Sequence, residues 1–299
     1  MRIFTYTKFD IFFALPFIVA LFSGFASLDA QNYKRFYSEV NKGFSLHEQG
    51  NYSEALMRYE AASQMVDFVQ TPFLQKFLKA AKKAKNKTLE ENYKRLIETQ
   101  RKTPAEYAHL GPKLDSLLAE DQRVRKKKQR LIKYYWKNVD NSSVWHSPKF
   151  LNAKNAQEEW SRTDSLNIQI LLSMFETYGF LDERKIGEER YAAVFVLLLH
   201  FDKDTSNTVL QPILDRALAK GQITPVSYAL ILDRHLNSCN LPQKYYSWPM
   251  LRSDPKLSEE DINQISDLRA DIGIYENEII INEARGFWSV SYKRTTPNG

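Results

Sequence analysis

Two thirds of the way along this 299-residue chain lies the apolar run Tyr191-Ala-Ala-Val-Phe-Val-Leu-Leu-Leu-His200. The run belongs to a predicted helix, 188–201, that is apolar on nearly every side after its first turn. Such a pattern is typical of a helix surrounded by other helices. We therefore expect it to be the most buried element of an all-α domain, with His200 as the polar residue that closes it.

Amphipathic patterns on both sides of this run predict further helices. Gly179, Gly221 and Gly273 are natural helix ends, and Ser258 to Asp261 is a capping signal. The expected architecture is a helical bundle-like domain over residues 113–284, followed by a frayed or loosely docked tail, 285–299. Its other predicted helices are 113–137, one ending at 178, 205–220, 225–237 and 258–271.

A second helical region, 31–102, precedes this domain. The stretch from Gly43 to Ala62, GFSLHEQGNYSEALMRYEAA, resembles one tetratricopeptide helix pair. In that pattern Gly43 allows close helix approach, and Tyr59 lies on the packing face of the second helix. A single repeat cannot bury its own apolar face. We therefore expect residues 73–100 to supply one or two partner helices, giving tetratricopeptide-like hairpins.

The first thirty residues differ in character from the rest. Arg2 and Lys8 precede an apolar stretch, 11–22, and a small-residue region, 23–30. This order is typical of a cleaved secretory signal peptide, 1–30. Its apolar core is shorter than the roughly 20 residues that span a bilayer. We expect an exported, periplasmic or secreted protein with no stable membrane span after cleavage; retention of the segment as an anchor is the alternative.

Composition narrows the chemistry further. Cys239 is the only cysteine, so the sequence predicts no internal disulfide and no cysteine-rich zinc site. No phosphate-cradling glycine loop, Gly-x-Ser-x-Gly or His-Glu-x-x-His motif is present. We predict no cofactor and no metal. The formal charge of +6 indicates a basic surface, but the export signal argues against a nucleic-acid partner.

Several charged residues interrupt the apolar stripes of the predicted helices. Because charge on a core-facing stripe is costly without partners, we expect these residues to converge with His200 on one polar cluster. Asp121 and Arg125 are four residues apart and can pair on one helix face. Asp233 and Arg234 point about 100° apart, so each needs another partner. The interrupting residues are Asp121, Arg125, Asp164, Asp233, Arg234 and Arg269.

Short motifs containing these charges are spread over most of the second region. They are Leu118-Ala-Glu-Asp121-Gln122-x-x-Arg125, Asp164-x-x-Asn167, Tyr178-Gly179, Gly187, His200, Gln211, Asp233-Arg234, Gln243-x-Tyr245 and Ile262-Asn263 through Arg269 to Gly273. The string resembles a bacterial family of uncharacterised proteins, domain of unknown function 6624. The resemblance implies a helical fold and often export, but no reaction. The family pattern continues Gln-x-Tyr-Gly, where this chain has Tyr246 in place of the glycine.

Two interpretations of the cluster remain open. In a binding module it would hold an unidentified small ligand or cross-link the helices. In a hydrolase-like enzyme His200 would be the general acid or base, oriented by Asp233 or Asp164, with Arg234 or Arg269 holding an anionic group. The candidate catalytic residues are His200, Asp233 and Arg234. The candidate ligand-binding residues are Asp121, Gln122, Arg125, Asp164, Asn167, Gln243, Tyr245 and Arg269.

The helical region 31–102 suggests a different class of partner. Residues 33–100 could bind a protein or peptide through a groove between helices. This hypothesis predicts exposed aromatic side chains along the groove, with Tyr52, Tyr59 and Phe68 as candidates. If these side chains are buried against neighbouring helices, the region is a helical platform.

Overall fold

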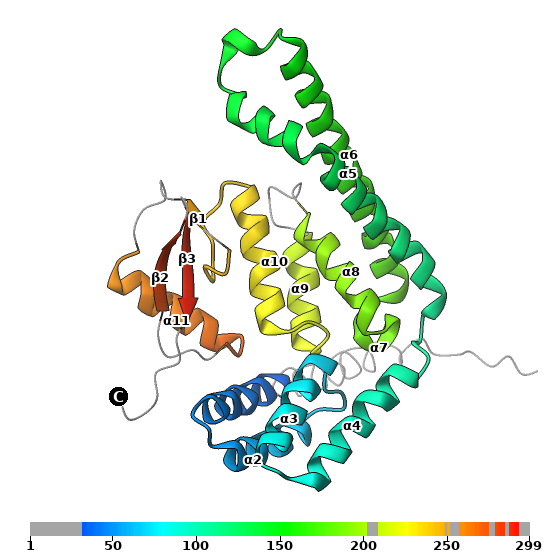
Figure 1. Ribbon diagram of the computed structural model, residues 1–299, viewed down its shortest axis with the longest axis vertical. Helices are drawn as coiled ribbons and strands as arrows, with labels where there is room; N and C mark the ends of the chain where they lie inside the picture. Colours follow the sequence, from blue (N-terminus) through cyan, green and yellow to red (C-terminus); the bar gives the residue numbers. More distant parts are fainter. Residues whose placement is uncertain are drawn as a thin grey trace, which may run out of the picture.

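The structure, a computed structural model, describes residues 32–201, 209–248, 250–251, 257–274, 279–284 and 287–292. The expected signal peptide, 1–30, lies outside these residues. Most of the described chain is helical, as predicted (Figure 1). Within it, no helix combines the length and the apolar character needed to cross a membrane.

Two helical hairpins form the N-terminal part. Residues 32–48 are helical and precede α2 (Tyr52–Ser63), while α3 (Thr71–Lys83) and α4 (Lys87–Lys102) form the second hairpin. The two hairpins pack around an aromatic core, in which the rings of Tyr59 and Phe77 stack with centroids 4.2 Å apart. The expectation that residues 73–100 supply partner helices is confirmed.

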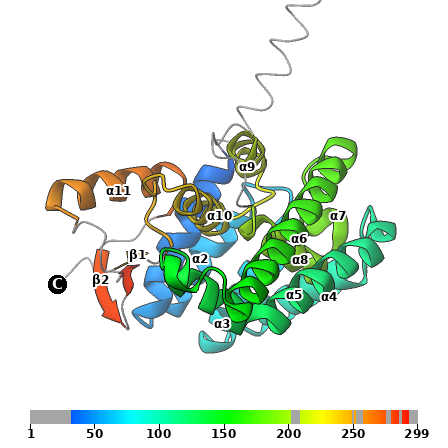
Figure 2. The ribbon, with the colours of Figure 1, turned by 90° about the horizontal axis from the view of Figure 1, so that it is seen from above.

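The second region is a helical domain in which α8 is the central helix. α8 contacts α5, α6, α7 and α10, in agreement with its apolar sequence. The expectation that it is the most buried helix is wrong, because four of its 12 residues are buried, against eight of 14 in α10. Seen from above, α9 and α10 lie between α11 and the long α5–α6 hairpin (Figure 2). The helices are α5 (Gly111–Asn138), α6 (Pro148–Tyr178), α7 (Glu183–Ile186), α8 (Glu188–Leu199), α9 (Leu210–Ala219), α10 (Pro225–Ser238) and α11 (Glu259–Asp271).

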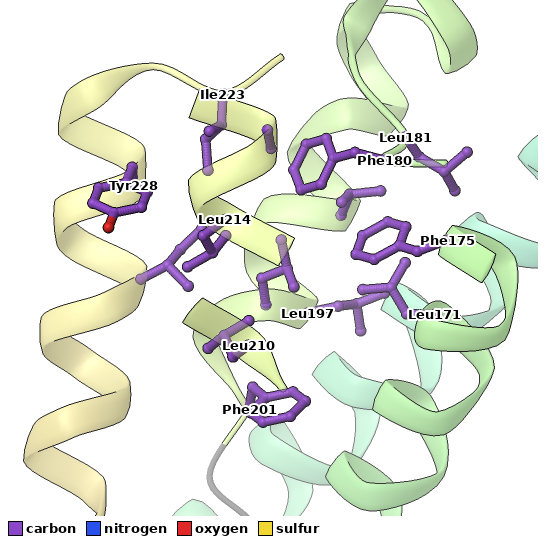
Figure 3. Close-up of a cluster of buried hydrophobic side chains, with 14 of the residues drawn as sticks. Leu171, Phe175, Phe180, Leu181, Leu197, Phe201, Leu210, Leu214, Ile223 and Tyr228 are labelled. Carbon is purple, nitrogen blue, oxygen red and sulfur yellow. The ribbon is translucent and has the colours of Figure 1, made fainter. Parts of the chain in front are cut away.

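Leucine and aromatic side chains fill the space between these helices. Leu197 of α8 lies between Leu171 of α6 and Leu214 of α9 (Figure 3), and all three are at most 1% exposed. Full burial of such a side chain contributes about 1.5–3 kcal/mol. This core, from Leu110 to Ile274, is separate from the aromatic core of the N-terminal hairpins.

Local signals position the helix ends as the sequence indicates. The Ser258 hydroxyl accepts the N–H of Asp261 at 3.1 Å, and the Asp261 carboxylate accepts the N–H of Ser258 at 2.8 Å, so a capping box starts α11. Gly179 follows α6 with a φ of +69°. This backbone conformation favours glycine, which has no Cβ atom to clash.

The C-terminal residues contain a small sheet that we did not predict. β1 (Met250–Leu251), β3 (Phe287–Tyr292) and β2 (Ile279–Ala284) form an antiparallel sheet in the order β1-β3-β2. The expectation of helical structure up to 284 is therefore wrong at β2, and residues 287–292 of the expected frayed or loosely docked tail are paired in the sheet. β-Branched and aromatic residues favour strands. β2 contains three isoleucines, and β3 contains a valine and three aromatic residues.

Buried polar contacts join the N-terminal hairpins to the helical domain. The N–H of Thr71, at the start of α3, donates to Glu183 Oε1 at 3.0 Å, and the Thr71 hydroxyl bonds the same carboxyl group. Burial raises the pKa of Glu183, helped by nearby Glu188 and opposed by the Thr71 hydrogen bonds. The Asn41 side chain also donates to the carbonyl of Gly273 at 2.7 Å.

The aromatic residues expected in a peptide groove have different environments. Tyr59 is fully buried, whereas Tyr52 and Phe68 are half-buried. Phe68 lies in the wall of a cleft of about 1140 Å³ that runs between the end of α4 and α7–α8. Only one of the three residues is therefore excluded from contact with a partner.

Gly43→Ala should destabilise the protein, because a Cβ atom at this position would overlap the ring of Tyr59. That ring is fully buried and stacked on Phe77, so it cannot move aside. We expect overpacking to lower the free energy of unfolding by about 1–3 kcal/mol, measured by urea denaturation.

A double-mutant cycle with Tyr59→Leu tests the cause. When Tyr59→Leu is already present, Gly43→Ala should cost much less, since the overlapping ring is gone. Equal costs in both backgrounds would contradict the steric explanation.

Candidate functional site

The candidate residues lie in two clusters, not in the single cluster that we expected. Each cluster ties together different parts of the helical domain. The first, the His200 cluster, consists of Asp121, Gln122, Arg125, Asp164, Asn167 and His200. The second, the loop clamp, consists of Asp233, Arg234, Gln243, Tyr245 and Arg269.

Asp121 is the centre of the His200 cluster. Its side chain is fully buried on α5. Arg125 Nε, one turn along the helix, donates to both carboxylate oxygens at 3.1 and 3.2 Å. Gln122 Nε2 donates to Oδ2 at 2.7 Å, and His200 Nδ1 lies 2.8 Å from Oδ1. The predicted pairing of Asp121 with Arg125 is therefore confirmed.

Arg125 extends the cluster to α6. Its Nη2 donates to Asp164 Oδ1 at 2.7 Å, and its guanidinium lies over the Trp160 ring, 4.2 Å from the centroid. Asn167, three residues after Asp164, donates to the carbonyl of Leu117 on α5 at 3.4 Å. These polar side chains on the α6 stripe thus find partners on α5.

The contact with Asp121 determines the role of Nδ1 in the His200 ring. Burial acts to raise the pKa of Asp121, but His200, Arg125 and Gln122 together outweigh it, and the pKa is lowered. An ionised carboxylate only accepts hydrogen bonds, so Nδ1 of His200 carries the proton. No hydrogen bond to Nε2 occurs among the described residues. Nε2 is therefore the ring atom available for a ligand or a proton transfer.

A small cavity of about 60 Å³ opens beside this ring. A water molecule needs about 10–15 Å³ by this measure, so the cavity has room for several waters or one functional group. Typical small-molecule pockets are larger, about 300–1,000 Å³. The walls are Gln157, Trp160, Ser161, Asp164, Ser165, Ile168, His200 and Phe201.

Asp121, Asp164 and His200 also offer three ligand atoms within 4.8 Å of one another, as a cation site would. However, the Arg125 guanidinium already bridges the two carboxylates. The same carboxylate of Asp121 also holds Nδ1 of His200. A metal ion would have to compete with both interactions, so these residues fit an ion-pair network better than a metal site.

The loop clamp is built around a second buried acid, Asp233 of α10. Its carboxylate accepts the N–H groups of Lys244, Tyr245 and Ser247 at 2.8, 3.0 and 2.6 Å. Burial raises the pKa of Asp233, although these three N–H donors oppose the rise. Between the bonded positions, Tyr246 has a φ of 51°. This value lies in the left-handed region that favours glycine.

The other members of the clamp hold the same loop. Arg269 Nη1 donates to the Tyr245 carbonyl at 3.1 Å and to the Ser247 hydroxyl at 3.3 Å. Gln243 Oε1 accepts the N–H of Trp248 at 3.1 Å, and Arg234 lies over the Trp248 ring, 5.1 Å from its centroid. The clamp positions residues 243–248 against α10 and α11.

These contacts correct the expected catalytic arrangement. Asp121 bonds Nδ1 of His200, whereas Asp233 binds loop backbone. The structure does not bring Asp233 and Arg234 to the His200 ring. Arg234 and Arg269 face the loop around Trp248 and Ser247, so neither lines the cavity at His200. The arginine of the His200 cluster is Arg125, which bonds the cavity residue Asp164 but does not itself line the cavity.

Five cavity residues on α6 were not among the candidates drawn from the sequence. Trp160 and Ser161 lie four and three residues before Asp164, which places them on its helix face. Gln157, Ser165 and Ile168 complete this wall of the cavity. Helical spacing could have identified Trp160 and Ser161, because Asp164 was already a candidate.

Asp121→Asn should lower the free energy of unfolding by about 3 kcal/mol at pH 7, because it removes one partner of a buried ion pair. The lowered pKa of Asp121 stabilises the fold above the unfolded value, about pH 4. This contribution is lost as the pH falls through the lower, folded pKa. The variant should therefore lose less stability than the wild type between about pH 4 and pH 2.

Asp115→Asn is the matched control, since Asp115 lies on the same helix with a side chain that is 57% exposed. Chemical denaturation at several pH values measures all three proteins. We expect the control to change stability by at most about 0.5 kcal/mol. Similar losses for both variants would contradict the central place of Asp121.

The chain matches no family model, no curated protein and no solved structure.

Proposed function

We propose that the protein is a binding module whose His200 cluster takes one compact polar group of a small ligand, such as a hydroxyl or an ammonium. The observation that carries this proposal is the 2.8 Å contact between His200 Nδ1 and Asp121. This contact orients the imidazole and leaves Nε2 available to bind a ligand. The His200 ring lines the cavity.

The cavity walls support recognition by hydrogen bonds. Asp164 contributes a carboxylate, Ser161 and Ser165 contribute hydroxyl groups, and Gln157 contributes an amide. The Ser165 hydroxyl donates to the Ser161 carbonyl at 2.7 Å. Because its one proton is used in this bond, the hydroxyl oxygen can act as an acceptor for a ligand donor. The cavity volume of about 60 Å³ restricts the bound part to a single functional group.

The charges of the His200 cluster predict which ligands the cavity prefers. The cluster combines two carboxylates with one guanidinium, which leaves one negative charge in excess when His200 is neutral. A cation or a neutral hydroxyl therefore suits the cavity better than an anion, because like charges repel strongly at short distance. This preference differs from the anionic ligand considered from the sequence, which relied on Arg234 or Arg269.

We also infer that the protein works outside the cytoplasm, as a periplasmic or secreted protein. Residues 1–30 support this inference by their basic start, short apolar core and small-residue end. The similarity of the motif string to the uncharacterised bacterial family agrees with export.

Binding of model groups can be followed at His200 by NMR. We expect glycerol and ethylammonium to shift the imidazole resonances of His200 at millimolar concentrations, and acetate to have little effect. A single functional group with few contacts binds weakly, so millimolar affinity, about −4 kcal/mol, is the appropriate scale.

His200→Gln assigns the resonance and should abolish the response. His146, an exposed histidine in the loop between α5 and α6, is the internal control whose signal should not move. A stronger response to acetate than to ethylammonium would reverse the proposed selectivity. No response to any of the three compounds would refute binding at this cavity.

The same contact favours a second candidate function, acid–base catalysis. A histidine oriented by a buried carboxylate is a common general acid or base. Here the orienting residue is Asp121 in place of Asp233, and the reacting atom is Nε2 of His200. A hydrolase-like enzyme would place the bond to be cleaved at the cavity mouth, beside Asp164.

Screening of the mature protein against ester, glycoside and phosphate substrates tests this candidate. Any activity should fall by about 10²-fold or more in His200→Ala, because general acid–base catalysis contributes about that factor. His146→Ala, which removes an exposed histidine in the loop between α5 and α6, is the matched control and should retain most of the activity. Equal activity in wild type and His200→Ala would exclude histidine-dependent catalysis.

A further inference from the structure

We propose that the end of the α5–α6 hairpin docks on an anionic lipid surface. The hairpin projects beyond the rest of the helical domain (Figure 1), and its end is formed by the last turns of α5, residues 139–147 and the first turns of α6. We call residues 126–154 the hairpin end. All of them belong to the described chain.

The hairpin end carries the basic excess of the whole protein. It contains seven lysines and one arginine but a single acidic residue, Asp140. The complete chain has 42 basic and 36 acidic residues. The positive excess of this segment, seven charges, is thus larger than that of the complete chain, six. Outside the hairpin end, acids and bases nearly balance.

Most of these basic side chains are free to meet a partner. Lys128 and Lys154 pair with Glu159 and Glu158 of α6 at 3.3 and 4.0 Å. The other six have no ion pair among the described residues, and all six are exposed; Lys149 lies over the Tyr134 ring, 4.3 Å from its centroid. They are Lys126, Lys127, Arg130, Lys133, Lys137 and Lys149. Each basic residue held near an anionic membrane contributes to attraction.

Exposed apolar side chains lie among these charges. Trp136, at the end of α5, is 60% exposed, Trp145 in the connecting loop is 45% exposed, and Leu151 in the first turn of α6 is 47% exposed. Tryptophan favours the interface between lipid headgroups and acyl chains. Amphipathic surfaces that combine such side chains with lysine lie in that interface.

Other side chains fill the core of the hairpin end. Ile132, Phe150, Ala153 and Ala156 close the space between α5 and α6 and are at most 7% exposed. The Tyr135 ring completes this contact, 5.6 Å from the ring of Phe150. Trp136 lies edge-on against Tyr135, with ring centroids 5.3 Å apart, and Trp145 Nε1 donates to the Val139 carbonyl at 2.9 Å, yet these two side chains stay 60% and 45% exposed. Their exposure points to a surface outside the chain.

A lipid surface fits these residues better than a nucleic acid. Arginine is the preferred residue for bidentate phosphate contacts in nucleic-acid recognition, and the hairpin end has one arginine among eight basic residues. The ammonium group of lysine is attracted to an anionic surface without requiring a fixed contact geometry. The exposed leucine and tryptophans gain by insertion into an apolar layer, which a duplex does not offer.

Vesicle flotation of the full mature chain tests the proposal. We expect binding to phosphatidylcholine vesicles with about 30% phosphatidylglycerol, weak binding to pure phosphatidylcholine, and loss of binding when salt rises from about 0.1 to about 0.5 M. Lys133→Glu/Lys137→Glu should weaken binding about 10-fold or more. Trp136→Ala/Trp145→Ala should weaken it without removing its salt dependence.

Lys79→Glu/Lys83→Glu on α3 is the matched control, because it makes the same change in net charge at exposed positions elsewhere. Circular dichroism confirms that each variant is folded. If both double variants lost vesicle binding equally, the proposal would be overturned in favour of an effect of net charge. Absence of binding to the anionic vesicles, or tight binding to duplex DNA with no vesicle binding, would also overturn it.

Discussion

The carboxylate of Asp121 is a charge that the helical domain must neutralise away from water. Burial of an unpaired carboxylate costs several kcal/mol, and here three side chains compensate it: Arg125 and Gln122 from the same helix, and His200 from the end of α8. Since Arg125 also binds Asp164, one buried charge links α5, α6 and α8. The cavity, the orientation of His200 and the access to Nε2 all follow from this link.

Asp233 shows that the domain neutralises its second buried acid differently. Backbone N–H groups of one loop surround this carboxylate, without a cation in direct contact among the described residues. Three such donors fix the loop geometry closely, including the left-handed backbone at Tyr246 that a glycine would adopt at lower cost. Two acids that look alike in the sequence thus serve different purposes: Asp121 orients a titratable side chain, and Asp233 orders backbone.

The features that could be predicted from the sequence are those formed by residues close together in the chain. Helix ends at Gly179 and Ser258 and the pairing of Asp121 with Arg125 arise within a few residues of chain, so spacing reveals them. The choice of Asp121 over Asp233 as the partner of His200 depends on how distant helices pack, which one helix pattern does not contain. The strands at 279–284 and 287–292 were missed for a related reason, because strands are stabilised by their pairing.

The His200 cluster also marks the point at which the character of α5 changes. α5 contacts α8 as well as α6, and its buried Asp121 is paired with Arg125. In the projecting part of the hairpin, α5 and α6 pack against each other, and small residues such as Ala153 and Ala156 are buried between them (Figure 1). With less apolar surface required for packing, the outer faces are left to lysine and tryptophan. The ion-pair network at the base of the hairpin therefore anchors the projecting segment to the body of the protein.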